Sequence, residues 1–284
     1  MNPSPVPTLI TSSGVAMPRL LYGTAWKKER TAALVSTALE QGFRGIDTAC
    51  QPKHYNEAGV GDGIAQVSMP TLSRESLYLQ TKFTPLPSQD PQRVPYDVNV
   101  APAAQVAQSI AVSLRHLRTP YLDCVLLHTP IRDPEVLRQV WQALEQQVND
   151  GVVRQIGICN CYDLDALTAL YQQAQVKPVV VQNRFYAESG YDRGIRRFCG
   201  ERQIIYQSFW TLTANRHLLS HDITSALARH YDRTPEQLLF RWLTQMGIVP
   251  LTGTGSVEHM QQDLGIFEFE LSAQHVSEMN ALIG

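Results

Sequence analysis

Gly45-Ile46-Asp47-Thr48-Ala49, continuing to His54-Tyr55-Asn56-Glu57 and Gly59-Val60-Gly61, is the stretch that decides the fold. An apolar, β-prone approach from Phe43 ends at a carboxylate, a short loop then presents a tyrosine, and a helix is predicted to begin at Glu57. A strand is thus followed by a helix, with an acid and a phenol at the carboxyl end of the strand. The rest of the chain repeats this unit.

Apolar segments of strand length recur along the chain, and stretches of helical periodicity separate them. The segments are continuous rather than alternating apolar runs, which is typical of a parallel sheet covered by helices. The expected strands are 20–24, 45–49, 77–83, 122–128, 155–160, 179–185, 204–209 and 248–252. The expected helices are 29–41, 57–66, 103–117, 134–149, 164–174, 192–201, 234–246 and 256–264. This rhythm, without a composition break, predicts one α/β domain over residues 1–284, a closed (β/α)8 TIM barrel.

Four segments lie outside the rhythm. Residues 8–18 are predicted to form an N-terminal β-hairpin with a glycine-containing turn. Residues 85–102 contain five prolines and are too long for an ordinary connection, so we expect a loop over the barrel mouth. Residues 211–219 form a second insert. Residues 271–283 are expected to form a C-terminal helix, with no extension that folds across the mouth.

Composition excludes several classes of function. The chain of 284 residues has a net charge of −2 and scattered positive residues, so no nucleic-acid partner is expected. No run approaches the roughly 18 apolar residues of a membrane helix, and residues 1–7 lack the basic and apolar regions of a signal peptide. We expect a cytoplasmic monomer. The five cysteines suit reduced, buried thiols, and their spacing does not predict a metal site.

Polar residues follow three consecutive predicted strands: Asp47, Lys82 and His128, with Tyr55 just beyond the first. Working residues of such barrels lie at the carboxyl ends of strands. A lysine is costly to bury unpaired, so Lys82 should pair with Asp47. Its ammonium should lower the pKa of Tyr55 and make the phenol a general acid, while His128 could orient a substrate oxygen. Each residue alone could be structural; together they predict an active site.

Four groups of motifs carry a resemblance to a known family. They are Gly45–Ala49 with Tyr55-Asn56-Glu57, Thr81-Lys82, Leu127-His128-Thr129-Pro130, and the segment 151–158. Together they resemble the aldo-keto reductase family over nearly the whole chain. The resemblance implies a (β/α)8 barrel and an oxidoreductase that reduces an aldehyde or ketone, a small-molecule carbonyl substrate, with a nicotinamide cofactor. It places the four catalytic roles on Asp47, Tyr55, Lys82 and His128.

The resemblance also implies a cofactor site. The family's serine and asparagine that hold the carboxamide correspond to Cys159 and Asn160 here, and its glutamine is Gln182. Gln207 stands where an aromatic residue usually stacks on the nicotinamide, which leaves Tyr206 or Trp210 as candidates. The implied cofactor-binding residues are Thr24, Cys159, Asn160, Gln182, Tyr206, Gln207, Ser208, Phe209, Trp210, Leu212, Pro250, Leu251, Thr252, Gly253, Thr254, His259, Gln262 and Asp263.

Two departures from the family pattern bear on the cofactor and on the phenol. After the last strand the usual lysine is missing and the arginine position is His259, so NADP (NADPH) is expected as the family default and NAD remains possible. The connection from Asp47 to Tyr55 is longer than usual through residues 50–54. The candidate substrate-pocket residues are Trp26, Phe83, Tyr96 and Trp210.

Two other interpretations stay open at this point. A nicotinamide-binding regulatory subunit would keep the cofactor pocket but turn over slowly or not at all. A barrel that uses Lys82 for Schiff-base chemistry is less favoured, because Asp47 should hold the lysine protonated.

Overall fold

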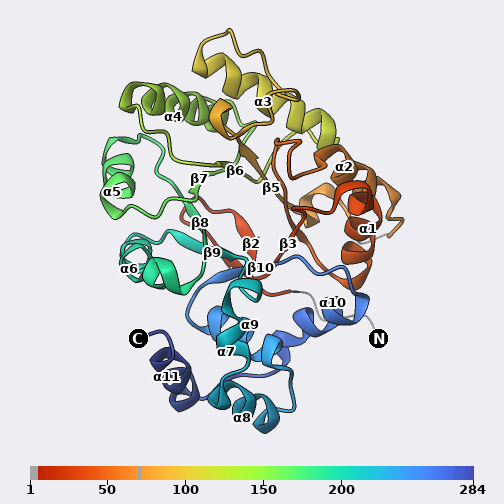
Figure 1. The fold of residues 1–284 in the computed structure, drawn as a ribbon. Helices are drawn as coiled ribbons and strands as arrows, with labels where there is room; N and C mark the ends of the chain where they lie inside the picture. Colours follow the sequence, from red (N-terminus) through yellow and green to blue (C-terminus); the bar gives the residue numbers. More distant parts are fainter. Residues whose placement is uncertain (1–5, 70–71) are drawn as a thin grey trace.

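The structure is a computed structural model that describes residues 6–69 and 72–284. Eight parallel strands close into a barrel in the order β10-β3-β4-β5-β6-β7-β8-β9, seen nearly along its axis in Figure 1. The strands are β3 (Leu21–Gly23), β4 (Gly45–Asp47), β5 (Tyr78–Phe83), β6 (Cys124–Leu127), β7 (Ile156–Cys159), β8 (Val180–Arg184), β9 (Ile205–Phe209) and β10 (Val249–Thr252). The predicted TIM barrel is confirmed. Residues 1–5, part of the expected polar tail, lie outside the described residues.

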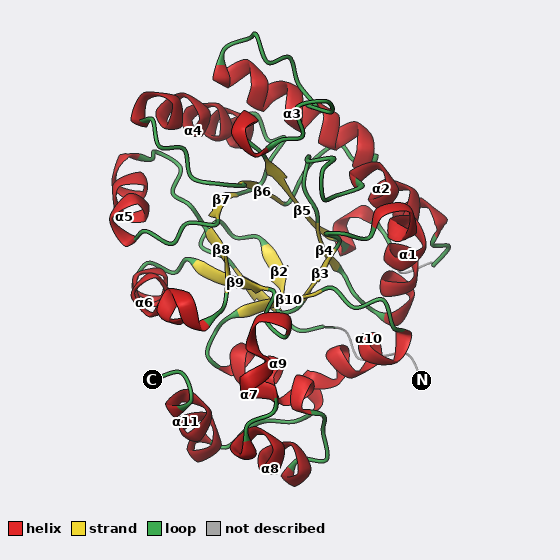
Figure 2. Cartoon of the chain, in the orientation of Figure 1, coloured by secondary structure: helices red, strands yellow, loops and turns green. Residues whose placement is uncertain are grey.

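Helices surround the barrel as its outer layer (Figure 2). Each expected helix is present within a few residues of its predicted bounds: α1 (Thr31–Gln41), α2 (Glu57–Gln66), α3 (Pro102–Leu117), α4 (Pro134–Asn149), α5 (Leu164–Gln173), α6 (Arg193–Glu201), α9 (Pro235–Gln245), α10 (Val257–Leu264) and α11 (Ala273–Ala281). Side-chain caps fix several starts: Asp133 caps α4, Asp163 caps α5, and Thr234 with Gln237 forms a capping box on α9.

Two short helices between β9 and α9 were not predicted. They are α7 (Arg216–Leu219) and α8 (Asp222–His230), and His221 caps α8 by accepting the backbone N–H of Ile223. Leu227 is buried, and α8 packs against α9 and α11. Helix α7 is a single turn, and the apolar positions of α8 are few, so their stability comes from this packing rather than from a periodic signal.

The predicted hairpin closes the amino-terminal end of the barrel. Strands β1 (Thr8–Ile10) and β2 (Ala16–Pro18) pair in antiparallel register, and in Figure 1 the second of them lies across the barrel centre. The Met17 side chain is fully buried against residues of the strand starts, and Thr11 donates a hydrogen bond to Gln155 at 2.7 Å. The hairpin therefore covers the amino-terminal end of the barrel, opposite the carboxyl ends of the strands.

Three further features of the described residues bear on function. No helix in this part of the chain is both long and apolar enough to cross a membrane. Within the same residues no three metal-ligating side chains come together. All five cysteines lie in this part of the chain and are free and buried, which matches the reduced thiols expected from the sequence.

Candidate active site

A cavity of about 1090 Å³ opens at the carboxyl ends of the barrel strands. Its lining comes from loops after nearly every strand, so residues far apart in the sequence meet there. Asp47, Tyr55 and His128 are among the lining residues, and Lys82 lies directly behind Asp47. The four predicted catalytic residues therefore lie together, as the strand-end argument expected.

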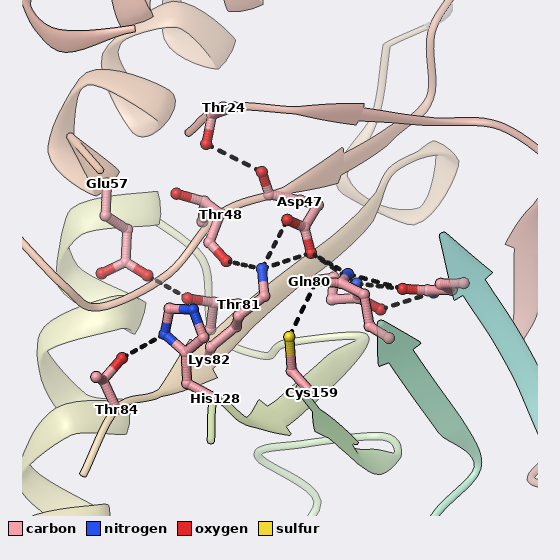
Figure 3. A network of polar contacts seen from close by, with 12 residues as sticks. Thr24, Asp47, Thr48, Glu57, Gln80, Thr81, Lys82, Thr84, His128 and Cys159 are labelled. Carbon is pink, nitrogen blue, oxygen red and sulfur yellow. Dashed lines mark hydrogen bonds and ion pairs between the residues drawn. The ribbon is translucent and has the colours of Figure 1, made fainter. Parts of the chain in front are cut away.

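Asp47 and Lys82 form a buried ion pair at the end of β4 and β5 (Figure 3). Lys82 Nζ lies 2.6 Å from Asp47 Oδ2 and 2.8 Å from Oδ1, and it also donates to the Thr48 carbonyl at 2.9 Å. Burial lowers the pKa of Lys82, but Asp47 raises it further, so the net pKa lies above its ordinary value. The expected pairing is present, and the lysine stays charged.

A layer of glutamine amides supports Asp47 from inside the barrel. Gln80 and Gln182 donate to Asp47 Oδ1 at 2.7 and 2.9 Å, and both also donate to the Gln207 side-chain oxygen. All three glutamines are buried. Because each amide is held by two partners, the carboxylate is fixed in orientation as well as neutralised.

Tyr55 lies against both the ion pair and the histidine. Lys82 Nζ is 5.3 Å from the centre of its ring, and its ring meets that of His128 edge-on at 5.9 Å. Burial raises the pKa of Tyr55 to about 12, Lys82 lowers it and Asp47 raises it. The lowering by Lys82 is the expected effect, but burial outweighs it, so the net direction differs from the expectation.

The longer connection before Tyr55 is anchored by the 85–102 loop. Gln51 donates to the Ser88 carbonyl at 2.8 Å, and Gln89 donates to the Cys50 carbonyl at 3.0 Å. Pro87 and Ser88, in a short turn at 86–88, line the cavity. The start of this loop therefore borders the mouth as expected, and it holds the unusual connection in place.

His128 sits just after β6 and is buried. Burial, then Lys82 and His54, hold its pKa well below the ordinary value, so the ring is neutral. Thr84 Oγ1 lies 2.7 Å from Nδ1. Figure 3 shows this contact between Thr84 and the ring. Within residues 6–69 and 72–284 the Nε2 atom has no hydrogen-bond partner, so it can bind a ligand. A neutral imidazole held by one nitrogen can donate or accept a single hydrogen bond at the other.

Cys159, Asn160 and Gln182 meet on the neighbouring wall of the cavity. Asn160 donates to the His128 carbonyl at 2.9 Å. Among the described residues, the side-chain oxygen of Asn160 receives only a long contact from the Tyr162 hydroxyl, at 3.5 Å. In the same described part of the chain, the side-chain oxygen of Gln182 accepts only from the Cys159 thiol, also at 3.5 Å. Burial raises the pKa of Cys159 to about 12, so the thiol is neutral. The two amide oxygens remain as acceptors for a ligand.

The residues of β9 divide between the cavity and the protein interior. Phe209 and Trp210 line the cavity, as does Leu212 beyond them. Tyr206 instead donates to Asp192 at 2.9 Å in the outer layer, and Gln207 is held in the glutamine layer. The alternation of side chains along a strand explains this division, because neighbouring residues point to opposite faces. Of the aromatic candidates for stacking, only Trp210 borders the cavity.

The loop after β10 forms the far end of the cavity. The predicted residues that line this end come from β10, from the loop and from α10: Leu251, Thr252, Gly253, Thr254, His259, Gln262 and Asp263. Thr252 donates to Asp263 at 2.6 Å, and burial raises the pKa of that carboxyl to about 7. Five predicted cofactor residues do not border the cavity: Thr24, Tyr206, Gln207, Ser208 and Pro250. Thr24 instead supports β4 by donating to the Asp47 carbonyl.

Of the predicted substrate-pocket aromatics, Trp26 and Trp210 line the cavity. Both are about half exposed and have left-handed backbone conformations, with φ of 63° and 55°. Bulky residues rarely adopt this conformation, and such strain often accompanies functional sites. Phe83 and Tyr96 do not line the cavity; they pack on each other at 5.6 Å, with the Tyr96 hydroxyl on the Thr84 carbonyl.

Several cavity residues were not predicted from the sequence. His54 lies on the Trp26 ring, with the two ring centres 4.0 Å apart, and it borders the cavity. Arg184 ends β8 within the lining, two residues after Gln182. A charged residue that closes a predicted barrel strand is the same signal that identified Lys82, and it could have identified Arg184.

Comparison with known proteins gives a consistent result. The model of the Aldo/keto reductase family matches residues 19–283. An aldo-keto reductase of Mycobacterium leprae is 30% identical over 98% of this chain and 91% of that protein. The glyoxal reductase of Bacillus subtilis is 29% identical over 97% of this chain and 92% of that protein.

A solved structure of an aldo/keto reductase from Brucella melitensis superposes with a TM-score of 0.82. Its sequence is 25% identical, and the match covers 98% of this chain and 99% of that one. Sequence and fold thus agree over almost the full length. The chain therefore belongs to the aldo/keto reductase family of oxidoreductases.

Proposed function

We propose that the protein reduces an aldehyde or ketone to an alcohol with NADPH, and that Tyr55 donates the proton. The observation that carries the proposal is the buried Asp47–Lys82 ion pair, which lies against Tyr55 at the edge of the strand-end cavity. A small carbonyl compound in this cavity can contact Tyr55 and His128 at the same time, because the two rings lie 5.9 Å apart.

Tyr55 is suited to donate a proton because it stays protonated at neutral pH. Burial raises its pKa to about 12, and the lowering by Lys82 is the smaller effect. The alkoxide produced when hydride adds to a carbonyl carbon is a stronger base than a phenolate. The proton therefore passes favourably from phenol to alkoxide, and the Lys82 ammonium stabilises the phenolate that remains.

His128 orients the carbonyl oxygen toward this phenol. Its ring is neutral because burial, Lys82 and His54 hold its pKa well below the ordinary value. If Thr84 donates to Nδ1, the proton of the imidazole resides on Nε2, which then donates to the substrate oxygen. The histidine thus positions the substrate and the tyrosine protonates it.

Asp47 keeps Lys82 in its charged form. The net pKa of Lys82 lies above its ordinary value despite burial, because the carboxylate contacts the ammonium through both oxygens. A protonated amine is not a nucleophile, so this geometry disfavours Schiff-base chemistry. It favours a role for Lys82 in stabilising negative charge on Tyr55.

The cavity suits a nicotinamide dinucleotide. The free acceptors on Asn160 and Gln182 match the amide N–H groups of a carboxamide, and Cys159 adds only a neutral thiol. The glycines and hydroxyls at 252–256 precede α10, where backbone N–H groups can hold phosphate. When bound, the reduced nicotinamide supplies hydride to the carbonyl carbon.

The preference for NADP rests on Lys27. Its side chain is nearly buried, and its ammonium contacts the Gly253 carbonyl. No carboxylate among the described residues forms an ion pair with it. Arg30 also lies near the loop at 253–255: its guanidinium is 4.0 Å from the point that a Cβ atom would occupy at Gly255. Burial, and then Arg30, lower the pKa of Lys27. NADP carries one phosphate more than NAD, and this additional phosphate would supply a negatively charged partner for Lys27 and Arg30.

Two measurements test the proposal. The protein is titrated with NADPH and with NADH, and binding is detected by the quenching of tryptophan fluorescence. NADPH should bind more tightly than NADH. Oxidation of NADPH with a panel of aldehydes and ketones should then show steady turnover. Binding without turnover of any carbonyl compound would support a regulatory subunit instead, and tighter binding of NADH would contradict the NADP preference.

A further inference from the structure

Arg184 projects from the end of β8 into the cavity without a polar partner for its side chain among the described residues. Its Nε atom is buried and makes no hydrogen bond within residues 6–69 and 72–284. Among those residues no carboxylate forms an ion pair with its guanidinium. Its side-chain neighbours are instead two rings: the guanidinium carbon lies 4.2 Å from the centre of Trp210 and 5.1 Å from that of Tyr186.

Three acidic groups at this end of the barrel already have other partners. Asp47 is neutralised by Lys82. Asp192 accepts from Asn183 and Tyr206, both of them buried side chains. Asp263, on the β10 side of the cavity, is bonded to Thr252. These three carboxylates therefore do not compensate the charge of Arg184, and no other carboxylate among the described residues lies within ion-pair distance of it.

An unpaired arginine of this kind has the chemistry of an anion-binding group. A partly desolvated guanidinium is costly without a partner, and stacking on aromatic faces offsets only part of that cost. Stacking also leaves the edge of the planar group free, where its N–H donors can bind two oxygens of a carboxylate or phosphate at once. Trp210, which has a left-handed backbone conformation, supplies the nearer of the two aromatic faces, at 4.2 Å from the guanidinium carbon.

The position of Arg184 relates this group to the reaction. Gln182 contacts Asp47 at 2.9 Å, and Arg184 lies two residues further along the same strand, about 6.6 Å toward the mouth. The free N–H edge of the Arg184 guanidinium is thus nearer the cavity mouth than the catalytic residues are. A molecule that contacts those residues and extends toward the mouth can reach it.

We propose that Arg184 binds an anionic oxygen group of a molecule held in the active-site cavity. This inference rests on the proposed carbonyl reduction, and the group has two sources: a carboxylate carried by the carbonyl substrate, or the pyrophosphate of the dinucleotide. If the source is the substrate, the protein prefers oxo compounds that carry a carboxylate a few bonds from the carbonyl group.

The test compares Arg184→Gln and Arg184→Lys with the native protein. Steady-state kinetics use 4-carboxybenzaldehyde and its neutral match 4-formylbenzamide, and NADPH affinity is measured by fluorescence titration. The control is Arg202→Gln, because Arg202 also stacks on a ring, Phe198 at 3.9 Å, but lies outside the cavity. Thermal unfolding of each variant checks that the fold is retained.

A substrate carboxylate predicts that Arg184→Gln raises KM for the carboxylate compound about ten- to hundredfold while KM for the amide and NADPH affinity stay unchanged. Pyrophosphate binding predicts a similar loss of NADPH affinity, with both aldehydes affected equally at saturating cofactor. Arg184→Lys should recover part of either effect. Unchanged carboxylate KM and unchanged NADPH affinity would overturn the proposal, as would an equal loss in Arg202→Gln.

The same experiment separates this inference from the proposed function. If the native protein reduces no carbonyl compound, the proposed function fails, but NADPH and 4-carboxybenzaldehyde can still be titrated as ligands. Binding of either that depends on Arg184 would support the anion site. If NADPH and 4-carboxybenzaldehyde both bind with affinities that the substitution of Arg184 does not change, the anion site is refuted.

Discussion

Breaking the Asp47–Lys82 pair one side at a time should reveal a large energetic coupling. In Asp47→Asn the remaining oxygen can keep the hydrogen bonds from Gln80 and Gln182, but the amide N–H₂ faces the Lys82 ammonium. A buried charge is left without its partner, which costs about 3–5 kcal/mol of unfolding free energy. Lys82→Met leaves the carboxylate with its two amide donors and should cost a similar amount or less.

The double variant should cost much less than the sum of the two single variants. The double variant contains no buried ion, because both charges are gone. The introduced asparagine would still accept hydrogen bonds from the glutamine layer, and the introduced methionine would fill the volume of the lysine. We therefore expect a coupling energy of at least about 2 kcal/mol.

Urea unfolding, monitored by circular dichroism and tryptophan fluorescence, gives the free energies of unfolding of the native protein, the two single variants and the double variant. The control cycle is Glu135→Gln with Arg138→Met, an exposed pair on α4 whose coupling should fall within experimental error. If the two costs at Asp47 and Lys82 add within about 0.5 kcal/mol, the account of a buried, mutually dependent pair is refuted.

Two further predictions follow from the pKa shifts. The carboxyl of Asp263 has a pKa of about 7 in the folded protein against 3.8 for a free side chain, so its ionisation disfavours the fold: stability is lost as pH rises from about 4 through 7, by up to about 4 kcal/mol. Asp263→Asn should remove this loss, making the protein more stable than the native form at pH 8 by urea unfolding; equal stability at pH 8 would contradict the shift. His128 is neutral, so His128→Gln, which keeps a hydrogen-bond donor, should retain more activity than His128→Leu in steady-state assays, and equal losses would argue against a hydrogen-bonding role.

The fold could be predicted because its signals are local and repeated. The barrel strands are continuous apolar runs, and caps such as Asp133 and Thr234 stand where the helices begin. Helix α8 could not be predicted in the same way. It has few apolar residues, and the helix is stabilised by packing on α9 and α11. These contacts join segments that are separated in the sequence, so no local pattern indicates them.

The site could be predicted as far as strand ends determine it. Asp47, Lys82 and His128 follow consecutive strands, so the barrel itself brings them together. The side a residue faces was harder to predict. Tyr206 points to the outer layer and Phe83 packs beside Tyr96, because one residue of register decides between cavity and interior.

The pKa of Tyr55 shows the same limit for electrostatics. The sequence correctly indicates that a lysine lies near the phenol and favours the phenolate. It does not show how much water the fold removes from around the ring, and this burial proves to be the larger effect. The depth of a side chain is a property of the closed barrel and of the loops over it.

The role of Tyr55 as proton donor is tested by the activity of Tyr55→Phe, measured together with the affinity of this variant for NADPH. Removing one hydroxyl should leave the cofactor contacts of Asn160 and Gln182 intact, so fluorescence titration should give a nearly unchanged dissociation constant. Carbonyl-dependent NADPH oxidation should fall by about a hundredfold or more, because the positioned proton donor is gone. Full turnover in this variant, with normal cofactor binding, would contradict the assignment of Tyr55 as the proton donor.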